Sequence, residues 1–177
     1  MVTASGRAAE NSAAAERSYV DSGLPYDAAI EAFESALGHF DRETTAALVG
    51  RAAPWPDVEA AMARMAGPSG LMIFDAFDQG VVASLSGTRV RGRLYMVGNP
   101  AVAAQIVRID VRACLYVPFR VAIHQGDGAA AAAAGATISY DRPSSSLGAL
   151  GRAELQPIGL ALDQKIEAVI QSVRRRA

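Results

Sequence analysis

The chain has 177 residues, which is enough for one folded domain with a buried core. Its 17 Lys and Arg residues against 18 Asp and Glu residues give a net charge of −1, which excludes a strong positive field for nucleic acid or an anionic membrane. No apolar run reaches the roughly 18 to 20 residues of a membrane span, and one cysteine, Cys114, excludes an internal disulfide. We therefore expect a cytoplasmic protein with no nucleic-acid partner and no membrane partner.

The N-terminal region divides into a polar segment and a helix. Residues 1–22 are small and polar with little to bury, so we expect a disordered tail followed by one α+β domain over residues 23–177. Residues 25–40 predict an extra N-terminal helix, because their apolar side chains recur at helical spacing. The stripe consists of Tyr26, Ile30, Phe33 and Leu37.

A short strand and a second helix are predicted next. Residues 44–51, TTAALVGR, are partly β-branched and predict an edge strand near Thr44. Residues 53–67 predict a helix that begins at Pro56 or Asp57.

Two strand-to-helix switches follow. Residues 70–77 predict a buried strand, and Asp78 after it is a favoured N-cap for a short helix over 79–87. The stretch RLYMVGNPAV repeats this pattern, because Gly98 permits a turn, Asn99 caps a helix and Pro100 suits its first position.

The two caps have two possible roles. If the strands before Asp78 and Asn99 are parallel neighbours, both helix N-termini open at the same end of the sheet, where backbone N–H groups could hold an anion. The alternative is that both side chains only cap, each contributing about 1 kcal/mol.

The last third of the chain predicts two strands and a long helix. Residues 113–125 alternate between apolar and polar, which is typical of a half-exposed antiparallel strand, and Pro118 indicates an edge or a bulge. An alanine-rich loop connects it to a strand over 136–141. Residues 152–176 predict a long helix on the sheet, with Leu155, Ile158, Leu162, Ile166, Val169 and Val173 on its apolar stripe.

Four stretches resemble a family known as domain of unknown function 302, over roughly residues 43–174. They are FDAFDQGVVAS, LYMVGNPAVAAQI, CLYVPFRVAIHQGDG and ISYDRP, in this order. The resemblance implies a TT1751-like fold, similar to the TATA-binding-protein and helix-grip arrangement, in which a curved mixed or antiparallel sheet wraps a long C-terminal helix. It implies no agreed activity. One departure is Gln79, where the family often has a histidine.

Arginines and tyrosines on neighbouring strands form the second candidate site. Arg89, Arg91 and Arg93 alternate on one predicted strand and share a face with Tyr95, so they could hold an acidic small molecule. Tyr116 and Arg120 occupy the analogous face of the next strand. The alternative for this row is the solvated face of a sheet.

Other chemistry has little support in the sequence. His39 and His124 lie at no metal-ligand spacing, and no phosphate-binding loop or cofactor motif is present, so we expect no metal and no cofactor. Asp75 and Asp78 should face different ways across a strand end, and Cys114 lacks an adjacent base.

Three hypotheses of function remain. In the first, the protein binds a small, partly apolar, anionic molecule in a pocket between sheet and helices, with Arg93, Asn99, Tyr116 and Arg120 as ligand-binding residues. In the second, it is a small cyclase, isomerase or lyase with Asp78 as acid or base and Tyr95 or Arg93 stabilising negative charge. In the third, it is an assembly module. For any of them we expect a homodimer, because exposed strand edges are often covered by a two-fold contact.

Overall fold

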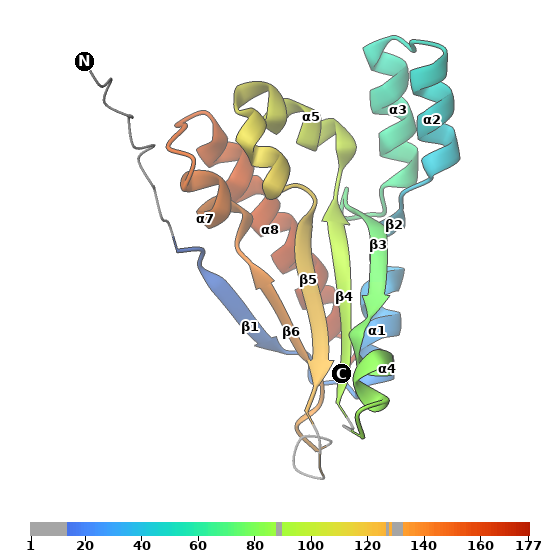
Figure 1. The fold of residues 1–177 in the computed structure, drawn as a ribbon, viewed down its shortest axis with the longest axis vertical. Helices are drawn as coiled ribbons and strands as arrows, with labels where there is room; N and C mark the ends of the chain where they lie inside the picture. Colours follow the sequence, from blue (N-terminus) through green and yellow to red (C-terminus); the bar gives the residue numbers. More distant parts are fainter. Residues whose placement is uncertain (1–13, 88–89, 127, 129–132) are drawn as a thin grey trace, which may run out of the picture.

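The computed structural model describes residues 14–87, 90–126, 128 and 133–177. Within them, one sheet has the strand order β1-β6-β5-β4-β3-β2, and every neighbouring pair is antiparallel except β2 and β3 (Figure 1). The strands are β1 (Arg17–Asp21), β2 (Gly38–His39), β3 (Met72–Asp78), β4 (Arg91–Gly98), β5 (Phe119–Gln125) and β6 (Thr137–Asp141). The helices are α1 (Tyr26–Ser35), α2 (Arg42–Gly50), α3 (Trp55–Met65), α4 (Gln79–Ser84), α5 (Pro100–Ile109), the 3-10 helix η1 (Val111–Leu115), α7 (Pro143–Gly148) and α8 (Leu155–Arg174).

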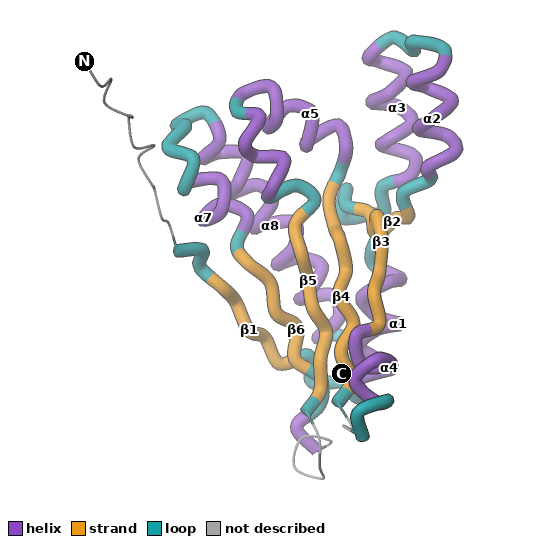
Figure 2. Tube along the Cα trace, in the orientation of Figure 1, coloured by secondary structure: helices purple, strands orange, loops and turns teal. Residues whose placement is uncertain are grey.

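The helices α1 and α8 cover one face of the sheet, and Figure 2 shows the strands as one open layer in front of them. This confirms the predicted α+β fold with a mixed sheet, a long C-terminal helix and an extra N-terminal helix. The core lies between the sheet and these two helices, since inward side chains of β4 and β5 and the predicted stripe of α8 are buried together. Its completely buried members include Tyr95, Val97, Val121, Ile123, Ile138, Phe33 and Ile166.

The predicted strand over residues 44–51 is wrong, because these residues form α2. Asp41 caps this helix by accepting a hydrogen bond from the Glu43 N–H at 2.9 Å. Leu48 then packs against Ala61 and Met62 of α3, so a helical hairpin replaces the expected edge strand. The edge strands of the described sheet are β1 and β2.

The expected tail also needs correction at its C-terminal end. Residues 17–21 form β1, which pairs with all five residues of β6, and Ser22 after it is completely buried. Pairing with β6 satisfies the backbone groups on one side of this edge strand, which composition alone could not indicate. Residues 1–13 of the expected tail lie outside the described residues.

The predicted strand over residues 113–125 is correct only from Phe119 onward. Val111–Leu115 form η1, capped by Asp110, and Pro118 precedes β5. Since β5 lies between β4 and β6, the expectation of an edge or a bulge at Pro118 is wrong. A proline cannot donate to a sheet ladder, and this ladder begins after it.

The strands β3 and β4 are antiparallel, so the expectation of parallel neighbours is wrong. Asp78 lies opposite Arg93, whereas Met72 lies opposite Gly98 at the other end. The helix α4 folds back onto β4 without crossing to a parallel strand, and a Cβ on Gly80 would lie 2.9 Å from the Val90 carbonyl oxygen. None of the helices in the described part of the chain is both long and apolar enough to cross a membrane.

Candidate functional site

Asp78 and Asn99 are both N-caps, as predicted. An Asp78 carboxylate oxygen accepts the Val81 N–H at 3.0 Å, and the Asn99 side-chain oxygen accepts the Ala101 N–H at 2.9 Å. The Asn99 amide also donates to the Gly70 carbonyl oxygen at 3.0 Å. Because β3 and β4 run in opposite directions, the two caps lie at opposite ends of the sheet and do not form one anion site.

Asp78 lines a hollow of about 320 Å³ between the first turn of α1, the end of β3 with α4, and the start of β4. We call it the Asp78 hollow. One part of its lining is polar and contains both ions and hydroxyls, and another part is apolar. The polar residues are Tyr26, Asp27, Asp78, Ser84, Arg91 and Arg93, and the apolar side chains are Ile30, Val81 and Val90.

Tyr26 is the most unusual residue of the hollow. Its side chain is buried, and its hydroxyl has no hydrogen-bond partner among the described residues. Burial raises the pKa of this phenol, and the nearby Asp78 carboxylate raises it further, while Arg91 and Arg93 oppose both effects. The phenol therefore stays protonated at neutral pH and keeps a hydrogen-bond donor at the hollow.

Two arginines surround this phenol. The Arg91 guanidinium lies 4.3 Å from the centre of the Tyr26 ring and forms an ion pair with Asp27. Arg93 approaches Glu34 of α1, with 3.4 Å between a guanidinium nitrogen and a carboxylate oxygen. Its Nε is buried and, like the Tyr26 hydroxyl, has no partner among the described residues.

Tyr95 lies behind the hollow and does not line it. Its side chain is completely buried, its ring centre is 5.1 Å from that of Phe33, and its hydroxyl donates to Glu34 at 2.8 Å. Burial, and then the hydrogen bond to Glu34, raise its pKa well above the usual value of a tyrosine. The structure therefore does not bring Tyr95 into contact with the space beside Asp78.

The arginine row of β4 contacts α1, because Arg91 pairs with Asp27 and Arg93 with Glu34. Arg91 nevertheless stays exposed, as the solvated-face alternative expects, whereas Arg93 is half-buried against α1. Arg89, the first arginine of the predicted row, lies outside the described residues.

Tyr116 and Arg120 lie apart from Asp78 and Arg93. Arg120 is opposite Met96 on β4, so its side chain extends from the face of the sheet that α1 and α8 leave open. Both residues line a different hollow, of about 260 Å³, whose other residues include Pro118 and Pro143. The predicted ligand-binding set is therefore divided between the two faces and the two ends of the sheet.

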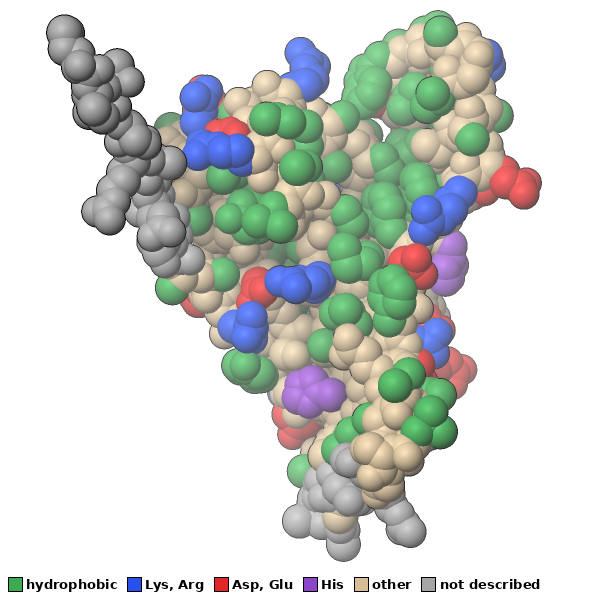
Figure 3. All heavy atoms as spheres, in the orientation of Figure 1, with side chains coloured by type: hydrophobic (Ala, Val, Ile, Leu, Met, Phe, Trp, Pro, Cys, Tyr) green, Lys and Arg blue, Asp and Glu red, His purple; other side chains and the backbone are tan. Residues whose placement is uncertain are grey.

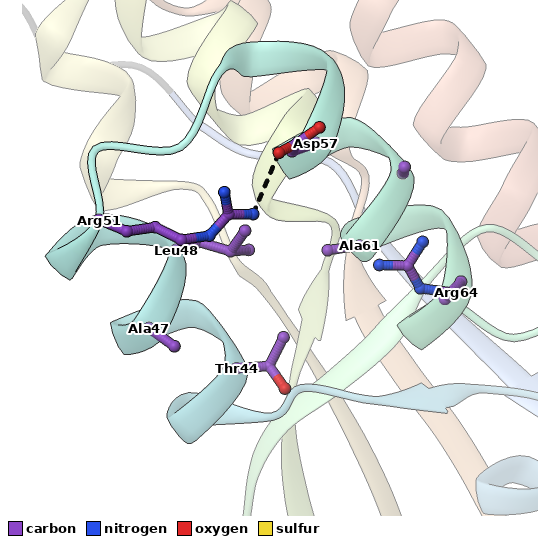
Figure 4. Close-up of a pocket in the computed structure, with 8 residues that line it drawn as sticks. Thr44, Ala47, Leu48, Arg51, Asp57, Ala61 and Arg64 are labelled. Atoms are coloured by element: carbon purple, nitrogen blue, oxygen red, sulfur yellow. Dashed lines mark hydrogen bonds and ion pairs between the residues drawn. The ribbon is translucent and has the colours of Figure 1, made fainter.

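A further hollow, of about 360 Å³, lies between α2 and α3 (Figure 4). Figure 4 shows Arg51 reaching across it to Asp57, and 3.1 Å separates their charged atoms. Thr44, Ala47, Leu48, Ala60 and Ala61 supply most of the remaining lining. It contains none of the predicted site residues and no buried polar atom without a partner, so we prefer the Asp78 hollow.

The Asp78 hollow suits an anion with an apolar part. Two buried donors, Tyr26 Oη and Arg93 Nε, need acceptors, and the second Asp78 oxygen could accept a proton or a hydrogen bond. Among the described residues, no group of three or more His, Cys, Asp or Glu side chains could hold a metal ion. Sequence reasoning placed Tyr26 in the core stripe of a helix, and no pattern in the sequence marks its hydroxyl as unpaired.

The comparisons with known proteins agree with the fold. The model of a family described as "Domain of unknown function DUF302" matches residues 49–173. A crystal structure of an uncharacterised conserved DUF302 protein from Bacillus stearothermophilus is similar with a TM-score of 0.61 and 14% sequence identity. The similarity covers 88% of this chain and 96% of that chain. No curated protein matches the chain.

Proposed function

Since the chain belongs to the DUF302 family, whose description names no activity, we propose a function from the site alone: it binds a small, partly apolar, anionic molecule in the Asp78 hollow. The observation that carries this proposal is the pair of buried donors, Tyr26 Oη and Arg93 Nε, for which the described part of the chain supplies no acceptor. Leaving a buried donor unpaired costs about 1 to 3 kcal/mol, so an acceptor from a ligand would bind favourably there.

The rest of the hollow supports the same chemistry. Its volume of about 320 Å³ is at the lower end of the range for small-molecule sites, which is about 300 to 1,000 Å³. Arg91 and Arg93 offer guanidinium donors at one wall, although each is paired with a carboxylate of α1, and Ile30, Val81 and Val90 offer apolar contact at another. A carboxylate attached to a short apolar group would use both walls.

Calorimetric titration with benzoate tests the proposal, with benzyl alcohol as the neutral probe of similar shape. We expect benzoate to bind at least tenfold more tightly than benzyl alcohol. Arg93→Met should remove this preference, because it deletes the cation and the Nε donor but keeps an apolar chain. The matched control is Arg51→Met, since Arg51 is also a paired arginine but lies between α2 and α3, away from the Asp78 hollow. Equal affinity for both probes would contradict the proposal.

The second candidate function is catalysis in the same hollow, which the position of Asp78 beside the Tyr26 phenol favours. Asp78 would move a proton, and Tyr26 with Arg93 would stabilise developing negative charge in a cyclisation, isomerisation or elimination. Tyr26 takes the place that we predicted for Tyr95. Asp78→Asn would then abolish turnover of a substrate found among co-purified molecules without reducing the melting temperature.

We also propose a cytoplasmic location, which the single cysteine of the sequence supports. Exclusive recovery of the tagged chain from a membrane or periplasmic fraction would contradict it.

A further inference from the structure

None of the described helices covers the face of the sheet opposite α1 and α8 (Figure 1), and the strand registers show how its side chains are arranged. Residues opposite one another on neighbouring strands point to the same face. One row across this face is apolar or small and ends in exposed aromatic rings, with Tyr19 66% exposed and Phe77 49% exposed. In order from β1 to β3 it consists of Tyr19, Ser139, Ala122, Leu94 and Phe77.

A charged row lies next to it. Arg17 donates to Asp141 at 2.7 Å, and Arg120 lies 3.7 Å from the other oxygen of Asp141. Signs therefore alternate from β1 through β6 to β5. Figure 3 shows this face, where charged side chains of opposite sign lie together among hydrophobic ones.

These two rows surround a hollow of about 300 Å³ over the centre of the sheet. Small side chains, Ser139 and Ala122, form its floor on β6 and β5, while Tyr19 and Leu94 stand on the strands to either side. The hollow is thus bounded in a similar way on both sides of a line between β5 and β6.

We propose that this face is the contact between two copies of the chain. The two-fold axis lies above the sheet, parallel to the strands and between β5 and β6. It places β6 opposite β5 of the partner subunit and β1 opposite β4 of the partner subunit. It places Asp141 opposite Arg120 of the partner subunit, and the reverse pair forms by symmetry. It also places Tyr19 opposite Leu94 of the partner subunit, with the small floor residues facing one another.

The alternating charges of this row favour a second copy of the chain over a partner whose surface carries charges of one sign. Under the two-fold axis, Asp141 meets Arg120 of the partner subunit, and this oppositely charged pair forms twice, while Arg17 faces the uncharged Met96 of the partner subunit. The four strands involved are spaced about 4.8 Å apart and give a patch smaller than the about 800 Å² per subunit of a standard interface. The dimer is therefore weak and depends on concentration.

This contact differs from the one that the sequence suggests. We expected association through the strand with Pro118 and an edge near Thr44. The structure makes β5 an interior strand and residues 42–50 a helix, so neither edge is available. In the proposed dimer the two copies therefore meet through this face of the sheet and not through strand edges.

Sedimentation equilibrium from about 1 µM to about 500 µM tests the proposal on the full chain. The wild-type mass should rise from 18.4 kDa towards twice that value. Ala122→Arg places a long charged side chain at the centre of the contact and should raise the dissociation constant at least thirtyfold. The matched control, Ala46→Arg on the exposed side of α2, should dimerise like the wild type.

A second variant makes the test independent of the folding of Ala122→Arg. Tyr19→Ser removes an exposed ring from an edge strand and should raise the dissociation constant at least tenfold, with an unchanged circular dichroism spectrum. A wild-type protein that stays monomeric over the whole range would overturn the proposal. Wild-type dimerisation that persists unchanged in the folded variants would place the contact elsewhere and would overturn it as well.

Discussion

Replacing Tyr26 by phenylalanine should make the protein more stable while weakening its binding of anions. The substitution removes a buried hydroxyl that has no partner among the described residues and leaves the ring under Arg91 in place. The desolvation cost of an unpaired buried polar group is about 1 to 3 kcal/mol. For a domain of this size, 1 kcal/mol corresponds to a change of about 2 to 4 °C in melting temperature.

Tyr95→Phe is the matched control, because it removes the same atom from a phenol that has a partner. The Tyr95 hydroxyl donates to the Glu34 carboxylate at 2.8 Å, and a hydrogen bond to a charged group contributes about 1.5 to 3 kcal/mol. The two variants should therefore shift the melting temperature in opposite directions, with Tyr26→Phe raised by at least 2 °C and Tyr95→Phe lowered by at least 3 °C.

Thermal melting followed by circular dichroism, together with urea denaturation, measures both effects. Titration with benzoate should then show weaker binding by Tyr26→Phe and unchanged binding by Tyr95→Phe. If Tyr26→Phe is destabilised as much as Tyr95→Phe, the Tyr26 hydroxyl has a partner in solution, and the reasoning that assigns it to a ligand is refuted.

Three further predictions concern single carboxylates. Asp78→Ala should lower the free energy of unfolding by about 1 kcal/mol, since the cap on Val81 is lost, whereas Asp78→Asn should leave it unchanged; equal losses in urea denaturation would contradict the capping role. Asp163 is buried on α8 and accepts hydrogen bonds from Arg142 and Ser144. Asp163→Ala should therefore lower the free energy of unfolding by about 3 kcal/mol or more. A loss below about 1 kcal/mol would show that this network contributes little to stability. Hydrogen bonds from Arg112 lower the pKa of Asp110 to about 2. The contribution of this carboxylate to the free energy of unfolding is therefore complete above about pH 4 and is lost as the pH falls towards 2. Asp110→Asn should lose less stability between about pH 4 and pH 2 than the wild type, and an identical pH profile of the two proteins would contradict this role of Asp110.

Local features of the fold were predictable because they depend on neighbouring residues. Asp78 and Asn99 are N-caps as expected, since each short polar side chain follows a strand and precedes a helical stretch. The apolar stripe of α8 was correct because a 20-residue helix repeats its signal over several turns. Short elements carry less signal. The strand predicted over residues 44–51 is wrong because the packing of Leu48 on α3 is not visible in their sequence.

Non-local features were not predictable. The twelve residues between Asp78 and β4 could have formed a crossover to a parallel strand, and nothing in their composition shows that α4 folds back onto β4. The antiparallel direction of β4 relative to β3 decides which residues lie at the same end of the sheet. Asn99 therefore lies at the opposite end of the sheet from Asp78, whereas Arg93 lies directly opposite Asp78. The first turn of α1 lines the same hollow as these two residues.

The candidate site was therefore only partly predictable. Asp78 and Arg93 were chosen for their residue types, and they line the same hollow. Tyr95 was chosen for the same reason but faces Glu34 inside the core. Tyr26 was missed, because an unpaired hydroxyl depends on what the folded chain places around it.

The most direct test of the binding site is a titration with benzoate followed in ¹H–¹⁵N correlation spectra of the assigned protein. We predict saturable shifts that are confined to amides around the Asp78 hollow, above all those of Val81, Arg91 and Arg93, and that benzyl alcohol does not reproduce. Saturable shifts confined to other surfaces, or no shifts at millimolar benzoate, would contradict the assignment of an anion site to this hollow.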